Sequence, residues 1–208
     1  MNPTRPARPP RPTTPEPVAA PALPQPWRLR LAGRWLRAGG VIAYPTEAVY
    51  GLGCDPLDPR AVQRILDLKC RPRAAGLILI AADFTQLEAF LLPLPPALHR
   101  CVFATWPGPV TWVLPCRPEV PVWLRGRHAA LAVRVTAHPT AAALCSRFGG
   151  ALVSTSANPH GREPARTPLQ VRRYFGAGVD HVLTAPLGGQ ARPSEIRDGR
   201  TRSIIRAG

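Results

Sequence analysis

The chain alternates between short, continuous apolar runs and longer segments in which apolar residues recur every three or four positions. Short continuous runs are typical of strands that are buried on both faces of a sheet, whereas the longer period is typical of helices. The runs that predict strands are residues 41–44, 77–80, 110–114, 131–135, 151–153, 181–183 and 203–205.

Capping residues mark several ends of the predicted helices. Asp58 and Pro59 predict the N-cap and the first residue of a helix whose apolar stripe runs from Val62 to Leu68. Gly39 and Gly149 are placed to end two others. The segments that predict helices are residues 28–38, 59–68, 83–92, 95–106, 138–148 and 167–175.

Because helices and strands alternate without an internal repeat, we expect an α/β fold with a twisted, mixed sheet flanked by helices. We expect this domain to span residues 27–208. Residues 1–26 hold 10 of the 28 prolines and almost no large apolar side chains. Such a segment cannot bury enough apolar surface to fold. It is expected to be a disordered Pro/Arg-rich arm, and the sequence does not reveal its role.

The net charge of +15 indicates an anionic partner such as a nucleotide, phosphate or RNA. The arm supplies only +2 of this charge, from three arginines less Glu16. A solvated, arginine-rich surface is the alternative interpretation.

The five cysteines are widely spaced and form no C-x-x-C pair, and the five histidines lack metal-ligand spacing. This pattern argues against a metal site and against a disulfide framework. No apolar run approaches the ~20 residues that a membrane helix needs, and the basic N-terminal segment lacks the apolar part of a secretory signal. We therefore expect a cytoplasmic protein without a membrane anchor.

Thr46 and Glu47 follow the first predicted strand and precede Gly51 and Gly53. Ligands of α/β folds commonly bind outside the ends of strands, and glycine lets the backbone approach a ligand closely. A turn with a capping threonine is the alternative, and the segment is not a P-loop.

Lys69 is the single lysine among 27 basic residues, and it stands with Arg71 and Arg73 at the end of a predicted helix. Three cations within five residues repel one another unless they face solvent or an anion. Polyphosphate suits a compact ammonium beside planar guanidinium groups. The alternative is that these cations satisfy the last carbonyl groups of the helix.

Ser154, Thr155, Ser156 and Asn158 follow another buried strand. Short hydroxyl and amide side chains suit phosphate oxygens or a small polar substrate, and an ST-turn is the alternative. No histidine or acid stands nearby in sequence to complete a catalytic triad. Arg134, inside an apolar strand, lies either on an exposed face or against an anion.

Taken together, these segments resemble the YrdC-like family of threonylcarbamoyl-AMP synthases, in its short single-domain bacterial form. The K-x-R pair of Lys69 and Arg71, combined with the S-x-N pair of Ser156 and Asn158, is the most specific part of the resemblance. The matching stretches are residues 44–47, 50–53, 69–72, 76–78, 106–111, 132–135, 138–139, 154–158 and 193–196.

The resemblance implies a twisted α/β sheet around a positively charged cavity and a nucleotidyltransferase reaction. L-Threonine, bicarbonate and ATP with Mg²⁺ would give L-threonylcarbamoyladenylate and pyrophosphate. The product would feed the N6-threonylcarbamoyladenosine modification of tRNA at position 37. The implied partners are downstream tRNA threonylcarbamoyl-transfer proteins, with tRNA or double-stranded RNA as a further ligand.

The resemblance also implies roles for individual residues. Lys69 and Arg71 would be catalytic, by neutralising charge on the leaving pyrophosphate. The implied ATP-binding residues are Lys69, Arg71, Arg73, Ser156, Asn158 and Arg206. The implied L-threonine-binding residues are Thr46, Arg134, Ser154 and Ser194.

The chain departs from the family pattern at Ala74 and Ala75, where many relatives carry a basic or amide residue, and at Glu195.

Two other functions are compatible with parts of this sequence. One is a double-stranded RNA-binding or ribosome maturation module without catalysis, which the basic charge would suit. The other is a different ATP-using transferase, such as a carbamoyl-transfer domain. The chain has no acyl-phosphatase-like or zinc-finger segment, which argues against it.

Overall fold

The computed structural model describes residues 23–208, except for the side chain of Arg73. The predicted arm lies outside the described residues apart from its last four, and the first helix begins at Pro26. The strands β1 to β9 are Ile42–Pro45, Tyr50–Gly53, Ile78–Ala81, Val110–Pro115, Ala130–Val135, Leu152–Ser156, His181–Val182, Glu195–Asp198 and Ile204–Arg206.

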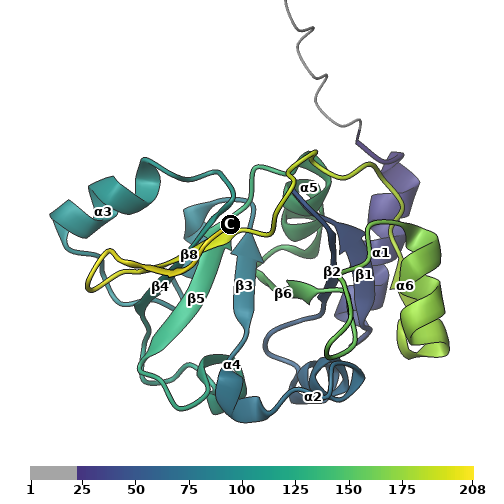
Figure 1. Cartoon of the computed structure of the whole chain (residues 1–208), viewed down its shortest axis with the longest axis horizontal. Helices are drawn as coiled ribbons and strands as arrows, with labels where there is room; N and C mark the ends of the chain where they lie inside the picture. Colours follow the sequence, from purple (N-terminus) through teal and green to yellow (C-terminus); the bar gives the residue numbers. More distant parts are fainter. Residues whose placement is uncertain (1–22) are drawn as a thin grey trace, which may run out of the picture.

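The helices flank this sheet (Figure 1). The helices α1 to α6 are Pro26–Arg37, Pro59–Leu68, Pro96–Phe103, Val122–Arg125, Pro139–Phe148 and Pro168–Phe175. The 3-10 helices η1 to η3 are Arg73–Ala75, Phe84–Leu87 and Gly176–Gly178. Within residues 23–208, no helix combines the length and the apolarity needed to cross a membrane.

The sheet is mixed, with the strand order β7-β1-β2-β6-β3-β5-β4-β8-β9 in the described part of the chain. Parallel pairs join β1 to β7, β3 to β5 and β4 to β8, whereas the other neighbouring strands are antiparallel. The expected α/β fold with a twisted mixed sheet is therefore confirmed.

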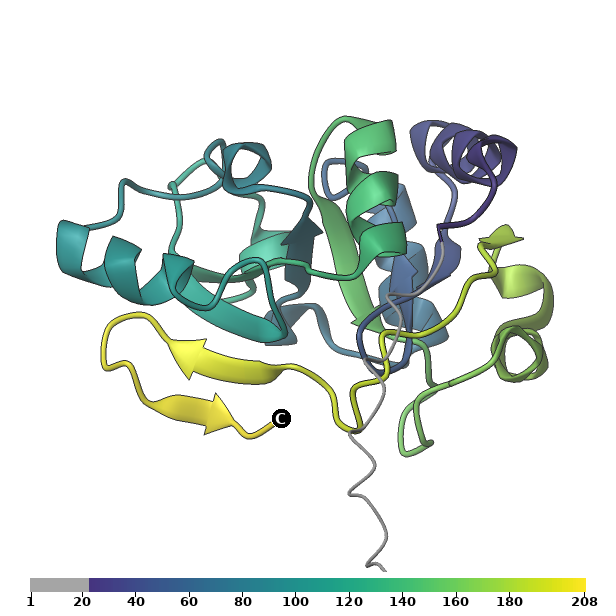
Figure 2. The same cartoon turned by 90° about the horizontal axis from the view of Figure 1, so that it is seen from above.

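Alternation along β1 divides the core between the two faces of the sheet. Ile42 and Tyr44 pack with α1 and α5, whereas Val41 and Ala43 belong to a larger cluster that includes α2, α3 and α6. In Figure 2, α5 and α1 stand side by side on one side of the molecule, and β8 with β9 forms a hairpin along another edge.

The helix predicted over residues 83–92 is wrong. Asp83 caps only the short 3-10 helix η2, by accepting from the Thr85 amide at 2.9 Å. Beyond it, Leu91 forms a β-bridge with Cys116, and the Leu92 amide donates to Pro115 at 3.1 Å. Backbone pairing with the end of β4 therefore replaces the helical turns that the capping residue predicts.

Two strands were not expected from the sequence. The first is β2, Tyr50–Gly53, which pairs with both β1 and β6. Its two glycines are atypical of a strand, so the sequence did not predict it. A Cβ at Gly53 would lie 2.6 Å from Tyr44 Cε1 and 2.7 Å from the Val153 oxygen, so glycine here allows close packing. The polar strand β8, Glu195–Asp198, gains its order from pairing with β4 and β9.

Candidate active site

A cavity of about 240 Å³ opens beside strands β2, β3, β5 and β6. Several residues that the sequence singled out meet here, although they are spread over most of the domain. The predicted site residues that line the cavity are Thr46, Arg71, Arg134, Ser154, Ser156, Ser194 and Arg206. The cavity thus collects guanidinium and hydroxyl groups, which suit an anionic or polar ligand.

Strand register brings the two serines of β6 to the cavity. Ser154 lies opposite Ile78 of β3, and Ser156 lies opposite Gly51 of β2. Residues two apart on a strand share one face, so both serines point to the same side. A Cβ at Gly51 would stand 3.4 Å from Thr46 Cγ2 and 3.5 Å from Ser154 Oγ. The missing side chain of Gly51 therefore leaves room in the cavity.

Lys69 lies at the C-cap of α2 and is only 8% exposed. Its ammonium donates to the Ser156 carbonyl oxygen at 2.6 Å, to the Asn158 carbonyl oxygen at 2.9 Å and to Asn158 Oδ1 at 3.2 Å. Three N–H groups thus meet three oxygens. Lys69 holds the end of β6 and joins the cavity wall through Ser156, without lining the cavity itself.

Asn158 organises the same loop from its other side. The Ser156 hydroxyl donates to Asn158 Oδ1 at 2.6 Å, and Asn158 Nδ2 donates to the Arg162 oxygen at 2.7 Å.

Burial, together with the charge of Arg71, lowers the pKa of Lys69 to about 8. The lysine therefore titrates much closer to neutral pH than an exposed lysine does.

Cys70 turns the chain from Lys69 to Arg71. Its backbone is left-handed, with φ +48°, and the Arg71 amide donates to the Leu66 oxygen at 2.9 Å, as in a helix C-cap. Arg71 then lines the cavity, and burial lowers its guanidinium pKa. Arg73, another predicted ATP ligand, has a side chain outside the described part of the structure.

Arg134 is buried in β5 and forms an ion pair of 3.4 Å with Glu47. Its Nε is also buried, and no hydrogen-bond partner accepts from it. A buried donor without a partner is costly, so a small movement of this guanidinium that gave Nε an acceptor would be favourable. The sequence assigned no role to Glu47. The available signal was an acid close behind a buried strand, in a chain with only 12 acidic residues.

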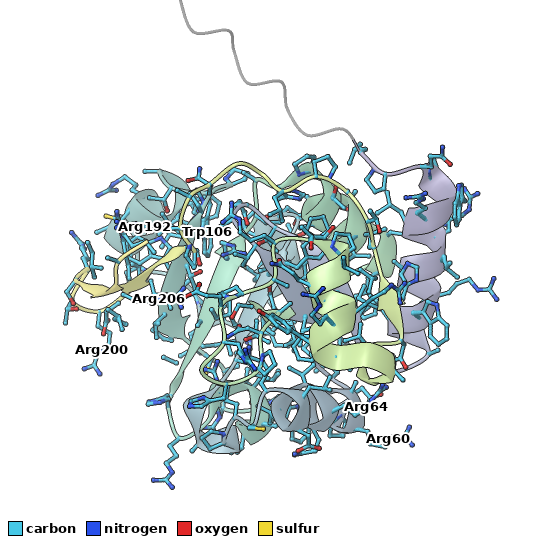
Figure 3. All side chains as sticks on the ribbon, turned by 45° about the vertical axis from the view of Figure 1, so that its right-hand side comes forward. Arg60, Arg64, Trp106, Arg192, Arg200 and Arg206 are labelled. Carbon is cyan, nitrogen blue, oxygen red and sulfur yellow. The ribbon has the colours of Figure 1, made fainter. Side chains whose placement is uncertain are left out.

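The C-terminal strand closes the cavity from the other side. Arg206 of β9 donates to the Ser194 carbonyl oxygen at 2.8 Å, and the hydroxyls of Ser194 and Thr111 lie 3.1 Å apart. Figure 3 shows Arg206 well back along this hairpin from Arg200, which lies at its tip. Thr46 also lines the cavity, and its hydroxyl donates to the Val49 oxygen at 2.7 Å.

The positive charges of the cavity arginines affect the pKa of Arg206. Burial lowers the pKa of Arg206, and the positive charges of Arg134 and Arg71 lower it further. Among the lining residues, Glu47 is the single carboxylate set against these three guanidinium groups. An anion bound between them would relieve their mutual repulsion.

A second cavity, of about 440 Å³, adjoins the first and shares Arg71, Ile78 and Arg206 with it. Its walls are more apolar and include Leu77, Leu124 and other aliphatic side chains. Arginines line both cavities, and the larger one adds more apolar surface, which is a common combination in ligand sites.

The fold and site define a mixed α/β protein whose cavity is lined by three arginines, one glutamate and several hydroxyl groups. Comparison with known proteins narrows this class. The family model Sua5_yciO_yrdC, described as "Telomere recombination", matches residues 34–208. The chain therefore belongs to the Sua5/YciO/YrdC family.

Two curated relatives are named threonylcarbamoyl-AMP synthase. The protein of Nitrosococcus oceani is 61% identical over 180 residues, which cover 86% of this chain and 97% of the relative. The protein of Halorhodospira halophila is 58% identical over 182 residues, which cover 88% of this chain and 95% of the relative.

Solved structures share the fold. Escherichia coli YciO matches with a TM-score of 0.79 at 28% identity, covering 91% of this chain and 93% of YciO. Sua5 of P. abyssi complexed with L-threonine matches with a TM-score of 0.75 at 34% identity, covering 83% of this chain and 51% of Sua5.

Proposed function

We propose that this chain is a threonylcarbamoyl-AMP synthase, the name that its relatives from N. oceani and H. halophila carry. The observation that carries the proposal is the buried Arg134, which lines one cavity together with Arg71, Arg206 and three serines. A carboxylate at Arg134 and phosphates at the other two arginines would place an amino acid beside a nucleotide.

The proposed reaction has two steps. The amine of L-threonine attacks the carbon of bicarbonate, and loss of water gives a carbamate. A carbamate oxygen then attacks the α-phosphorus of ATP, and the bond from that phosphorus to the pyrophosphate oxygen breaks. The products are L-threonylcarbamoyladenylate and pyrophosphate. No protein nucleophile is needed, so catalysis rests on positioning and on stabilisation of charge.

Arg134 would bind the threonine carboxylate, with Thr46, Ser154 and Ser194 around the rest of the amino acid. These four residues come from segments far apart in sequence and line one cavity. Since a guanidinium group matches the planar geometry of a carboxylate, Arg134 would also fix the direction in which the threonine amine points.

Arg71 and Arg206 would bind the phosphates, at the junction between the two cavities. Lys69 would act by holding Ser156 and Asn158 in place and by supplying positive charge behind them. For direct contact with a phosphate, its ammonium would exchange one of its three protein acceptors for a phosphate oxygen. The more apolar second cavity is suited to the nucleoside.

Magnesium enters this proposal as part of the ATP substrate. Within residues 23–208, no group of three or more His, Cys, Asp or Glu side chains is placed to hold a metal ion. Glu47, the carboxylate of the cavity, is already bound by Arg134 and Thr136. The protein residues do not fit a resident metal, and we assign no step to one.

The product is a mixed anhydride that must be transferred onto tRNA, so we propose that downstream transfer proteins in the cytoplasm consume it. The five cysteines are all free, which is compatible with a reducing compartment.

The proposal predicts that pyrophosphate release from ATP and magnesium requires L-threonine and bicarbonate together. Release would be measured with each co-substrate omitted in turn, and the adenylate product would be identified by mass. Release without threonine would instead indicate a different acyl or carbamoyl acceptor.

Binding of a non-hydrolysable ATP analogue is expected to weaken roughly tenfold between pH 7 and pH 9. Lys69 has a pKa lowered to about 8, so it is mostly charged at pH 7 and mostly neutral at pH 9. Calorimetry without threonine measures this dissociation constant while avoiding the ionisation of the amino acid. The Lys69→Ala variant should lose the pH dependence, and an unchanged dependence in that variant would contradict the assignment.

A second candidate function rests on a separate observation. A wide groove of about 970 Å³ beside β4 and β5 is lined by Arg117, Arg125, Arg127 and Arg200. Such a surface favours a phosphodiester backbone, so double-stranded RNA binding without catalysis is the alternative. This binding would fall steeply with salt and would not depend on Lys69. Tight salt-sensitive RNA binding without pyrophosphate release under any condition would favour this alternative.

A further inference from the structure

Glu47 is the one carboxylate among the residues that line the 240 Å³ cavity. It lies two residues after the end of β1 and is 8% exposed. One carboxylate oxygen accepts a hydrogen bond of 2.6 Å from the Thr136 hydroxyl, and the other lies 3.4 Å from an Arg134 nitrogen. Both oxygens are therefore engaged within the protein.

The energetics of this pair show why Glu47 stays charged. Burial alone would raise its pKa, but the positive charge of Arg134 and the Thr136 hydrogen bond outweigh it, so the pKa lies below its usual value. A carboxylate in this state is a poor proton acceptor near neutral pH. Glu47 is therefore suited to holding the Arg134 guanidinium and the Thr136 hydroxyl in place.

The partners of Glu47 are themselves held in place. The Thr136 hydroxyl accepts from the His138 amide at 3.1 Å, and His138 Nε2 lies 3.1 Å from the Pro186 oxygen. The backbone oxygen of Glu47 accepts from the Gln190 amide at 2.9 Å. The segment that leads from β7 to Ser194 is thus tied to the same residue that pairs with Arg134.

We propose that Glu47 is a positioning residue for the amino acid substrate, which fixes the guanidinium plane of Arg134 so that this group meets the substrate carboxylate in the cavity. The proposal rests on the proposed function. It deepens that function by assigning amino acid recognition to a pair, with Arg134 in contact with the substrate and Glu47 acting through Arg134.

Two effects of removing the charge of Glu47 oppose each other. Loss of a nearby negative charge would strengthen the attraction between Arg134 and a carboxylate. Loss of the anchor would let the guanidinium rotate or withdraw, and misplacement by about 1 Å can cost on the order of a hundredfold in rate. We expect the geometric effect to dominate because an arginine recognises a carboxylate through a fixed plane.

The test compares Glu47→Gln and Glu47→Asp with wild-type protein in the threonine-dependent pyrophosphate assay. For Glu47→Gln, we expect the KM for L-threonine to rise roughly 10- to 100-fold, with kcat and ATP-analogue affinity within about twofold of wild type. Glu47→Asp keeps the charge, and its KM should lie between those of Glu47→Gln and wild type.

Asp180→Asn is the matched control. Asp180 pairs with Arg64 at 3.0 Å and accepts from the Val41 amide at 2.7 Å, and it does not line the cavity. It therefore reports what loss of an acid–arginine pair does elsewhere in this fold. Its threonine KM should stay within about twofold of wild type, since neither Asp180 nor Arg64 lines the cavity.

A double-mutant cycle with Arg134→Lys separates positioning from general destabilisation. If Glu47 acts through Arg134, the two changes are not additive, and Glu47→Gln raises the threonine KM little once the guanidinium is gone.

A threonine KM that is unchanged or lowered in folded Glu47→Gln overturns the proposal, as does full additivity in the cycle. Absence of threonine dependence in the wild-type protein would instead reject the proposed function itself. If Glu47→Gln does not fold, the KM of Glu47→Asp decides.

Discussion

Replacing Lys69 by alanine is expected to reduce threonine-dependent pyrophosphate release by roughly 100-fold or more, as removal of a single charge-stabilising donor does in other enzymes. The substitution removes a buried cation and all three hydrogen bonds that the lysine donates to Ser156 and Asn158. Steady-state kinetics would show the loss in kcat as well as in the KM for ATP. Activity above about one tenth of wild type would contradict an essential role.

Controls separate the charge of Lys69 from its hold on the loop. Arg60→Ala removes an exposed cation from the same helix, α2, and should leave activity unchanged. Asn158→Ala removes one acceptor and the loop contacts to Arg162, but it keeps the ammonium. If the charge of Lys69 matters more than its hydrogen bonds to the loop, Asn158→Ala should lose less activity than Lys69→Ala. RNA affinity should be nearly intact in Lys69→Ala, because many arginines remain for a phosphate backbone.

Arg134→Ala is expected to have the largest effect on L-threonine, with its KM raised at least roughly 100-fold. The guanidinium is the cavity's buried cation with an unpaired donor, and alanine leaves no group to bind a carboxylate. Calorimetry would measure threonine affinity directly, and affinity for an ATP analogue would be compared in the same samples. Equal losses for both ligands would contradict a threonine-specific role.

The same substitution should lower stability by about 3–5 kcal/mol at neutral pH, because it leaves Glu47 buried without its partner. In the wild-type protein the pKa of Glu47 is lowered, so the pair stabilises the fold above the unfolded pKa and this contribution is lost as the pH falls through the folded one. In Arg134→Ala burial should raise that pKa instead. Urea unfolding of the variant should then show relative recovery at mildly acidic pH, whereas Arg134→Lys should be less destabilised throughout.

Most helices and strands could be predicted from local pattern, since apolar periodicity and capping residues act over a few positions. Asp58 and Pro59 do begin α2, and the Asp58 carboxylate accepts from the Arg60 and Ala61 amides as its position predicts. The prediction failed at Asp83, where the same kind of cap begins only a 3-10 turn, because Leu91 pairs with Cys116. Tertiary pairing outweighed local preference there.

Strand β2 shows the opposite failure. Its sequence, Tyr50–Gly53, has two glycines and reads as a turn, but β1 and β6 supply hydrogen-bonded neighbours on both sides. Glycine weakens an isolated strand because it brings no side chain to pack. Inside the sheet the same lack of a side chain gives Tyr44 and Val153 the space that they occupy.

The sequence by itself determined the α/β class, the family resemblance and most of the polar residues that line the cavity, because these depend on residue type and spacing. Only the tertiary structure decided what those residues do to one another. It placed the Lys69 ammonium on the carbonyl oxygens of the loop after β6, and it paired Arg134 with Glu47. The reason is physical: a buried charge takes its partners from whatever strand register and helix packing bring within about 4 Å, and sequence order does not encode that distance.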